Sequence, residues 1–149
     1  MYKVLLVNGP YLNFDCDLSM EIYGNTSVKE IEKSVSSILS ANDISYESFQ
    51  SNSEDEIVNW LKKKSEADFL LLNPGALTNS CLGLRNTVLE IKIPFLEIHL
   101  NYDYSCKESK FFSNFSDLSL GVLAGLGLKG FSIASKFAID YLDQHDKSE

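Results

Sequence analysis

The chain has 149 residues, of which 44% are hydrophobic and 23% are charged. We interpret it as one domain, residues 1–149, long enough to bury a core without disulfides or a structural metal. The net charge of −8, with Arg85 as the single arginine, argues against a nucleic-acid surface, which requires clustered lysines and arginines.

The sequence contains no candidate for a membrane span or a secretion signal. The apolar start, residues 1–10, is too short to cross a bilayer and lacks the basic segment and cleavage site of a signal peptide. Cys16, Cys81 and Cys106 are odd in number and lack metal-ligand spacing, which is typical of reduced thiols. These features predict a cytoplasmic protein with no membrane contact and no metal site.

Short apolar or β-prone runs predict five strands. The first, YKVLLVN, is almost continuously apolar, as in a strand covered on both faces, and the turn signal NGP ends it. Residues 9–26 have no regular period, so they are interpreted as a long loop. The strands are expected at residues 2–8, 45–50, 68–73, 94–100 and 118–125.

Four stretches with helical spacing lie between or after these runs. The S-x-x-E patterns that begin at Ser27 and Ser53 are capping boxes and predict the start of the first two helices. A third helix is expected over roughly residues 80–91, and the last from about Gly130. The side chains expected to face the core are Ile31, Val35, Ile38, Leu39, Ile57, Val58, Leu61, Cys81, Leu84, Val88, Ile133, Phe137 and Tyr141.

Strands that alternate with amphipathic helices predict an α/β fold with a parallel sheet. Five strands favour a flavodoxin-like three-layer sandwich with the strand order 2-1-3-4-5. Ligands of such sheets bind beyond the carboxyl ends of the strands. Asn8, Asn73 and the segment EIHLN lie at those ends, so the topology predicts a site there.

General acid–base chemistry is the function that the motifs leave open. NGPYLN has too few glycines for a phosphate-binding loop, and no G-x-S-x-G nucleophile motif precedes a helix. His99 lies at the carboxyl end of a strand and can donate or accept a proton near neutral pH. Glu97, two residues earlier, points to the same face and could orient the ring. The alternative is a buried histidine whose two nitrogens bind the main chain.

Two further residues have a structural and a functional interpretation. Tyr23, in MEIYGN, lies on the loop above the same sheet edge, where it either acts in catalysis or anchors the loop by packing. Asn73, in LLNPGA, either binds a substrate hydroxyl or caps the helix that follows.

Seven segments together resemble a known family. They are LLVNGPYLN, EIYGNTS, FQSNSEDEIVNWL, LLNPGALTNS, GLRN, IPFLEIHL and GVLAGLGLKG. Their order and spacing resemble type II 3-dehydroquinate dehydratase (type II dehydroquinase) over nearly the whole chain. The resemblance implies a flavodoxin-like subunit, a homo-oligomer of trimers assembled into a dodecamer, no cofactor, and a polyhydroxy carboxylate as substrate.

The resemblance also implies a reaction and its residues. A hydro-lyase of this family, in the shikimate pathway of aromatic amino acid biosynthesis, removes water from 3-dehydroquinate to give 3-dehydroshikimate. A tyrosinate takes a proton alpha to the ketone, an enolate forms, and a histidine protonates the departing hydroxyl. By similarity, Tyr23 is this tyrosine, His99 is the histidine, and Glu97 is the carboxylate that orients it.

Substrate binding follows from the same resemblance. Asn73 matches the asparagine of NPGA, which contacts a substrate hydroxyl. The main-chain amides of Leu100 and Asn101 match those that bind the substrate carboxylate. Asn79 stands in place of a histidine and can still hydrogen-bond a hydroxyl, although it cannot transfer a proton. Lys110 stands where the family has an arginine, and as a point charge it replaces that arginine only in part.

The sequence departs from the family pattern where the tyrosine is activated. Leu18 replaces the lid arginine that lowers the pKa of the tyrosine, Tyr11 replaces an asparagine that holds the enolate, and Cys106 replaces a second arginine. Holding an ordinary tyrosine ionised at neutral pH costs roughly 4 kcal/mol without a nearby cation. Three hypotheses stay open: a working dehydratase, a homologue that binds another small polyhydroxy ligand, and a silent homologue kept for assembly or regulation.

Overall fold

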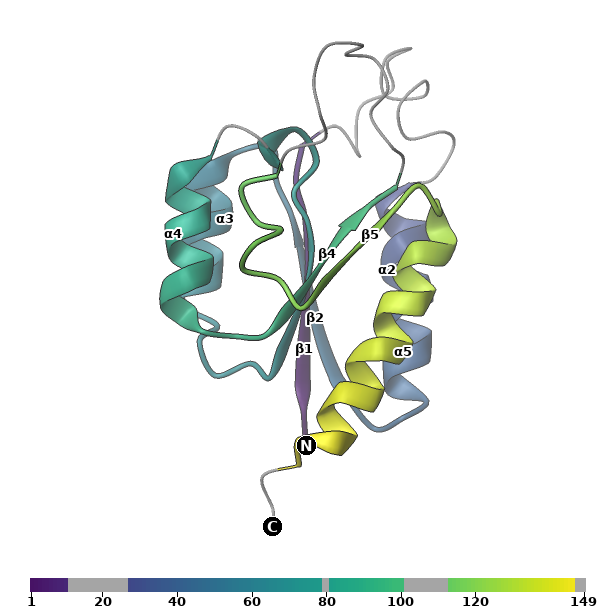
Figure 1. The fold of residues 1–149 in the computed structure, drawn as a ribbon. Coiled ribbons are helices and arrows are strands. Elements are labelled where there is room, and N and C mark those ends of the chain that lie inside the picture. The colour runs from purple at the N-terminus through teal and green to yellow at the C-terminus, as the bar shows by residue number, and fades with distance from the viewer. Residues whose placement is uncertain (11–26, 79–80, 101–112, 147–149) are drawn as a thin grey trace.

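The computed structural model describes residues 1–10, 27–78, 81–100 and 113–146. Its strands form one parallel sheet in the order β2-β1-β3-β4-β5 (Figure 1). The strands are β1 (Lys3–Asn8), β2 (Ser45–Gln50), β3 (Phe69–Asn73), β4 (Phe95–His99) and β5 (Gly121–Ala124). The predicted α/β flavodoxin-like fold and its strand order are confirmed.

Helices cover both faces of the sheet (Figure 1). The described helices are α2 (Val28–Ser40), α3 (Glu54–Lys62), α4 (Leu82–Ile91), α5 (Leu128–Gln144) and the short 3-10 helix η1 (Gly75–Thr78). Helices α2 and α5 pack together on one face, and α3 and α4 pack together on the other. None of these helices has the length and apolar composition needed to cross a membrane.

The helix starts follow the capping patterns of the sequence. The Ser27 hydroxyl accepts a hydrogen bond from the Glu30 main-chain N–H at 3.2 Å, and the expected cap at Ser53 also forms. At the start of α4, the side chain of the N-cap residue makes no capping hydrogen bond. Instead, a carboxylate oxygen of Glu54 in α3 accepts from the Leu84 main-chain N–H at 2.8 Å. This bond ties the start of α4 to α3.

Alternating side chains of the strands build two separate apolar layers. Leu6 and Leu71 belong to the cluster under α2 and α5, whereas Leu5 and Leu72 belong to the cluster under α3 and α4. All four side chains are fully buried. The continuous apolar runs of β1 and β3 are therefore explained by a sheet that is covered on both faces.

The predicted core face of the last helix is wrong. Ile133 and Phe137 are 45% and 41% exposed, and Tyr141 is only partly buried. Helix α5 carries a second stripe with helical spacing, and this stripe faces the core: Phe131, Ala134, Ser135, Ala138 and Leu142. The small side chains within that stripe, Ala134, Ser135 and Ala138, let α5 pack closely against the sheet and α2, which favours burial of this face.

The 113–120 segment, which leads into β5, is attached to the sheet and to the core below it. The main-chain N–H of Leu120 donates to the carbonyl of Phe95 in β4 at 2.9 Å. Phe115 is fully buried in the cluster under α3 and α4. These contacts hold the polar side chains of the segment alongside β4.

Candidate active site

Glu97 and His99 lie on one side of β4, at its carboxyl end. Glu97 is fully buried and His99 is 9% exposed. Nε2 of His99 lies 3.5 Å from Oε1 of Glu97, within reach of an ion pair with a protonated ring and at the outer limit of a hydrogen bond. This ring nitrogen therefore faces a carboxylate, rather than the main-chain acceptor that the structural alternative requires.

Two serines of the 113–120 segment hold the same carboxylate. Ser116 Oγ donates to Oε2 of Glu97 at 2.7 Å, and its distance to Oε1 is 3.3 Å. Ser113 Oγ donates to Oε1 of Glu97. The buried carboxylate thus has a hydroxyl donor on each oxygen and an imidazole beside one of them.

These contacts keep Glu97 ionised. Burial raises the pKa of this carboxyl, but His99 and the hydroxyls of Ser113 and Ser116 together outweigh burial and hold the pKa below its usual range. The ionised carboxylate lies 3.5 Å from Nε2 of the imidazole and can orient the ring. The pair can therefore present His99 as a general acid at the edge of the sheet.

Asn8 and Asn73 form a second polar pair, at the ends of β1 and β3. They are register partners, are 0% and 1% exposed, and are joined by a hydrogen bond from Nδ2 of Asn73 to Oδ1 of Asn8 at 3.1 Å. Within the described residues, Nδ2 of Asn8 and Oδ1 of Asn73 have no hydrogen-bond partner. A ligand hydroxyl can satisfy both, since it donates and accepts. The alternative that Asn73 caps the next helix is wrong, because its oxygen accepts nothing there.

The two polar pairs flank the same edge of the sheet. Asn73 follows the alternation of β3 and leaves the sheet towards α2 and α5, as Leu71 does. Glu97 and His99 follow Phe95 and leave the sheet towards α3 and α4. A ligand above the carboxyl ends of β3 and β4 would lie between the hydroxyl-binding amides and the acid.

The main chain after β4 is fixed at Leu100. Leu100 is 1% exposed, and its carbonyl accepts a hydrogen bond from the N–H of Gly127 at 2.9 Å. The carbonyl of His99 accepts from the N–H of Gly125 at 3.2 Å. The remaining residues implied by the resemblance lie outside the described part of the chain: Tyr23, Asn79, Asn101 and Lys110, together with the substituted positions Tyr11, Leu18 and Cys106.

Sequence reasoning did not assign Ser113 or Ser116 to the site, and it placed Asn8 at the site edge of the sheet without giving its amide a role. The serines are separated from Glu97 by 16 and 19 residues, and Asn8 is 65 residues from Asn73. The available signals were the position of Asn8 at the end of β1 and the S-x-x-S spacing that puts two hydroxyls on one turn.

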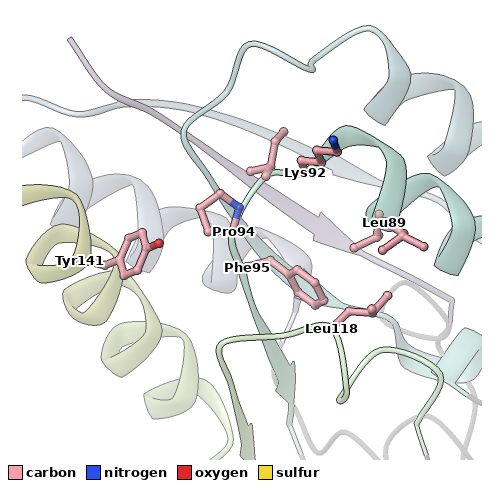
Figure 2. A pocket seen from close by; sticks show the side chains of 8 residues that line it. Leu89, Lys92, Pro94, Phe95, Leu118 and Tyr141 are labelled. Atoms are coloured by element: carbon pink, nitrogen blue, oxygen red, sulfur yellow. The ribbon is translucent and has the colours of Figure 1, made fainter. Parts of the chain in front are cut away.

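Elsewhere, the described residues provide no competing centre. Among residues 1–10, 27–78, 81–100 and 113–146, no group of three or more His, Cys, Asp or Glu is arranged to hold a metal ion. A surface hollow of about 370 Å³ lies at the amino end of β4, where Figure 2 shows Pro94 and Phe95 between Tyr141 of α5 and Leu89 of α4. Its lining is mainly apolar, and it lies at the opposite end of β4 from His99.

Comparisons of the sequence with known proteins give one consistent group of relatives. Residues 2–139 match the family model described as Dehydroquinase class II. The chain is 38% identical over 142 residues to a 3-dehydroquinate dehydratase of Haemophilus influenzae (strain 86-028NP), with 95% of each chain covered. It is 38% identical over 141 residues to a 3-dehydroquinate dehydratase of Mannheimia succiniciproducens, with 94% of each chain covered.

The fold comparison gives similar neighbours. The crystal structure of a type II dehydroquinase from Butyrivibrio crossotus DSM 2876 matches with a TM-score of 0.83 and 27% identity, over 92% of this chain and 97% of that chain. A 3-dehydroquinate dehydratase-like protein from Bifidobacterium longum shares the fold with a TM-score of 0.66 and 20% identity, over 96% of this chain and 99% of that one.

Proposed function

The chain belongs to the dehydroquinase class II family, and from this premise we propose that it removes water from 3-dehydroquinate to give 3-dehydroshikimate in the shikimate pathway. The observation that carries the proposal is the buried, anionic Glu97 beside His99 at the ligand-binding edge of the sheet. An elimination of water needs such an acid, because hydroxide is a poor leaving group until a proton reaches it.

The proton transfers divide between two side chains. The Tyr23 oxygen takes a proton alpha to the ketone and leaves an enolate, and the enolate then expels the hydroxyl group. Protonated His99 gives its proton to that group, which departs as water. Tyr23 then passes the proton that it took from the substrate to His99, which restores the tyrosinate and the protonated imidazole for the next turnover. Glu97 stabilises the positive charge on the ring before each transfer.

Binding of the substrate uses the other groups at this edge. A substrate hydroxyl accepts from one amide of the Asn8–Asn73 pair and donates to the other. The main-chain amides of Leu100 and Asn101 bind the carboxylate, with Asn79 and Lys110 as further polar contacts. No step of this scheme calls for a cofactor.

A second candidate function is favoured by the substitutions around the tyrosine. Leu18 and Cys106 place no cation where the family has arginines, and Asn79 cannot transfer a proton. These changes favour a homologue with little or no dehydratase activity, which binds another polyhydroxy ligand or serves assembly or regulation. The buried acid pair favours the enzyme, since a silent protein gains little from keeping a desolvated carboxylate beside a histidine.

The assay is direct. Purified protein is mixed with 3-dehydroquinate, and the ultraviolet absorbance of the conjugated product is followed. We expect turnover, and we expect Tyr23→Phe to lower kcat by roughly 10²-fold or more, because phenylalanine cannot take the proton. Absence of product at high enzyme concentration would leave the second candidate. Undiminished turnover by Tyr23→Phe would assign the base to another residue.

We also propose that the protein is a cytoplasmic homo-oligomer built from trimers. Its support is an apolar surface around β5, which is an edge strand, and along the outer side of α5. The exposed residues there are Leu120, Val122, Leu126, Ile133 and Phe137. Size-exclusion chromatography with light scattering is expected to give a mass that is a multiple of three chains. A monomer at micromolar concentration contradicts this.

A further inference from the structure

The Glu97 carboxylate depends on donors from outside its own strand. It is fully buried, and its register partners are Leu72 on β3 and Val122 on β5, neither of which carries a charge or a side-chain donor. A buried carboxylate without hydrogen bonds binds a proton rather than remain charged. Among the described residues, His99 is the ionisable side chain that lowers the pKa of Glu97. The hydroxyl donors come from the 113–120 segment.

The hydroxyl protons of that segment are directed at the carboxylate. The main-chain N–H of Phe115 donates to Ser113 Oγ at 3.0 Å, so this oxygen serves as an acceptor there while its own proton points to Glu97. Ser116 has one hydroxyl proton, and the 2.7 Å distance to Oε2 of Glu97 identifies the bond that it makes. Each carboxylate oxygen therefore receives one hydroxyl.

The segment itself is fixed from its outer side. Arg85 of α4 binds both carboxylate oxygens of Asp117, at 2.6 and 2.8 Å, and donates to the carbonyl of Asn114 at 2.7 Å. The N–H of Asn114 donates to the carbonyl of Thr78 at 2.9 Å. The planar guanidinium thus joins two positions of the segment to one helix, and the serines between and beside them have little freedom.

We propose that Ser113 and Ser116 are positioning residues of the dehydration: their hydroxyls hold Glu97 as an oriented anion against the imidazole of His99. The inference rests on the proposed function, because it assigns these serines to the acid of that reaction. They do not contact the substrate. Loss of either hydroxyl leaves a buried oxygen of Glu97 without its donor, so the carboxyl takes up a proton at higher pH and no longer stabilises protonated His99.

The test compares Ser116→Ala with the parent chain in two measurements. Carbon-13 NMR of the glutamate carboxyls follows the titration of Glu97, whose signal is identified by its absence in Glu97→Gln. We expect the Glu97 midpoint to rise by about one pH unit. In the kinetic assay, we expect the acid-side fall of kcat to move to higher pH by a similar amount, with KM changed less than about twofold.

Two variants separate this role from a general loss of structure. Ser116→Thr keeps the hydroxyl at a half-buried position and is expected to restore both the midpoint and the pH profile. Ser119→Ala removes a hydroxyl from the same segment, one that donates to the Ser116 carbonyl at 3.0 Å, and it is expected to leave the Glu97 midpoint unchanged. An unchanged midpoint in Ser116→Ala, or an equal shift in Ser119→Ala, overturns the proposal.

Failure of this inference is distinguishable from failure of the proposed function. The NMR titration uses the free protein and needs no turnover. If the parent chain does not convert 3-dehydroquinate while Ser116→Ala still shifts the midpoint, the serines hold Glu97 and the proposed reaction is wrong. If the parent chain is active and the midpoint does not move, the reaction stands and the role of the serines is wrong.

Discussion

Replacement of His99 by alanine is expected to lower kcat for the dehydration of 3-dehydroquinate by roughly 10² to 10⁴-fold. Alanine offers no proton to the departing hydroxyl, so the enolate must expel hydroxide or wait for a proton from water. KM is expected to change much less, since the Asn8–Asn73 pair and the main-chain donors proposed for the substrate carboxylate do not depend on the ring. The ultraviolet assay of product formation gives both constants.

The chain provides a matched control for this variant. His145 is its only other histidine, and it lies exposed after α5, where it stacks on Tyr141 with a ring-centre distance of 4.1 Å. His145→Ala removes the same side chain near the amino end of β4, the opposite end from His99, and is expected to leave kcat and KM within about twofold of the parent values. The comparison separates loss of a particular acid from loss of imidazole in general.

Glu97→Gln tests whether the carboxylate acts through the ring. Glutamine keeps the shape of the side chain but not the negative charge, so protonated His99 loses its stabilising partner. We expect a fall in kcat smaller than that of His99→Ala.

If His99→Ala retains more than about a tenth of the parent kcat, the ring is not the general acid and proton donation belongs to another group.

Strands β1 and β3 could be predicted from the sequence because burial on both faces produces a continuous apolar run. LLV in β1 and FLLL in β3 are apolar at every position, and the turn signals NGP and NPG mark where each strand ends. Because β1 and β3 are parallel, their carboxyl ends lie at the same edge of the sheet. The location of the candidate site therefore follows from local patterns, and so does the shared face of Glu97 and His99.

The face of α5 could not be read in the same way. Ile133 and Phe137 form one apolar stripe, while Phe131, Ala134 and Ala138 form another. Hydrophobicity alone favours the bulkier stripe. The structure buries the second stripe, in which the small side chains of Ala134 and Ala138 leave room for close packing. Beside this stripe, the hydroxyls of Ser34 in α2 and Ser132 in α5 lie 3.1 Å apart. The choice depends on a neighbour that local periodicity does not contain.

The partners of the site residues were out of reach for a related reason. The position of Glu97 in a buried strand predicts that its carboxylate needs hydrogen-bond donors, but it does not predict which residues provide them. Its serines follow a segment that lies outside the described residues, and Asn8 meets Asn73 only because β1 and β3 are adjacent in the sheet. Period-two spacing identifies residues on one strand, whereas contacts between elements require the packed chain.

Gly9→Ala is expected to destabilise the protein by roughly 3 kcal/mol or more, which is the upper range for overpacking. A methyl group at Gly9 would lie 2.2 Å from the carbonyl oxygen of Pro74 and 2.7 Å from its carbonyl carbon. Both atoms belong to the main chain, so no side-chain rotation relieves the overlap. The N–H of Gly9 also donates to the Asn73 carbonyl at 2.8 Å, which holds the two segments at this distance.

The contact is reciprocal, which makes relaxation costly. A methyl group at Gly75, whose φ is +58°, would lie 2.7 Å from the carbonyl oxygen of Pro10. The turn after β1 and the turn after β3 are therefore packed backbone against backbone. Separating them to admit a methyl group must stretch the Gly9–Asn73 hydrogen bond and pull Asn8 away from Asn73, so substrate binding is expected to weaken together with stability.

Gly130→Ala is the matched control, and the comparison is made by chemical denaturation at one protein concentration, because association shifts the midpoint. A methyl group at Gly130 meets Leu126 and Ile98 at 3.6 and 3.7 Å, which is ordinary contact, so stability is expected to stay the same or rise by up to about 1 kcal/mol. Equal denaturation midpoints for Gly9→Ala and the parent chain would show that the two turns separate easily. The amide pair would then be held by its own hydrogen bond rather than by the glycine contact beneath it.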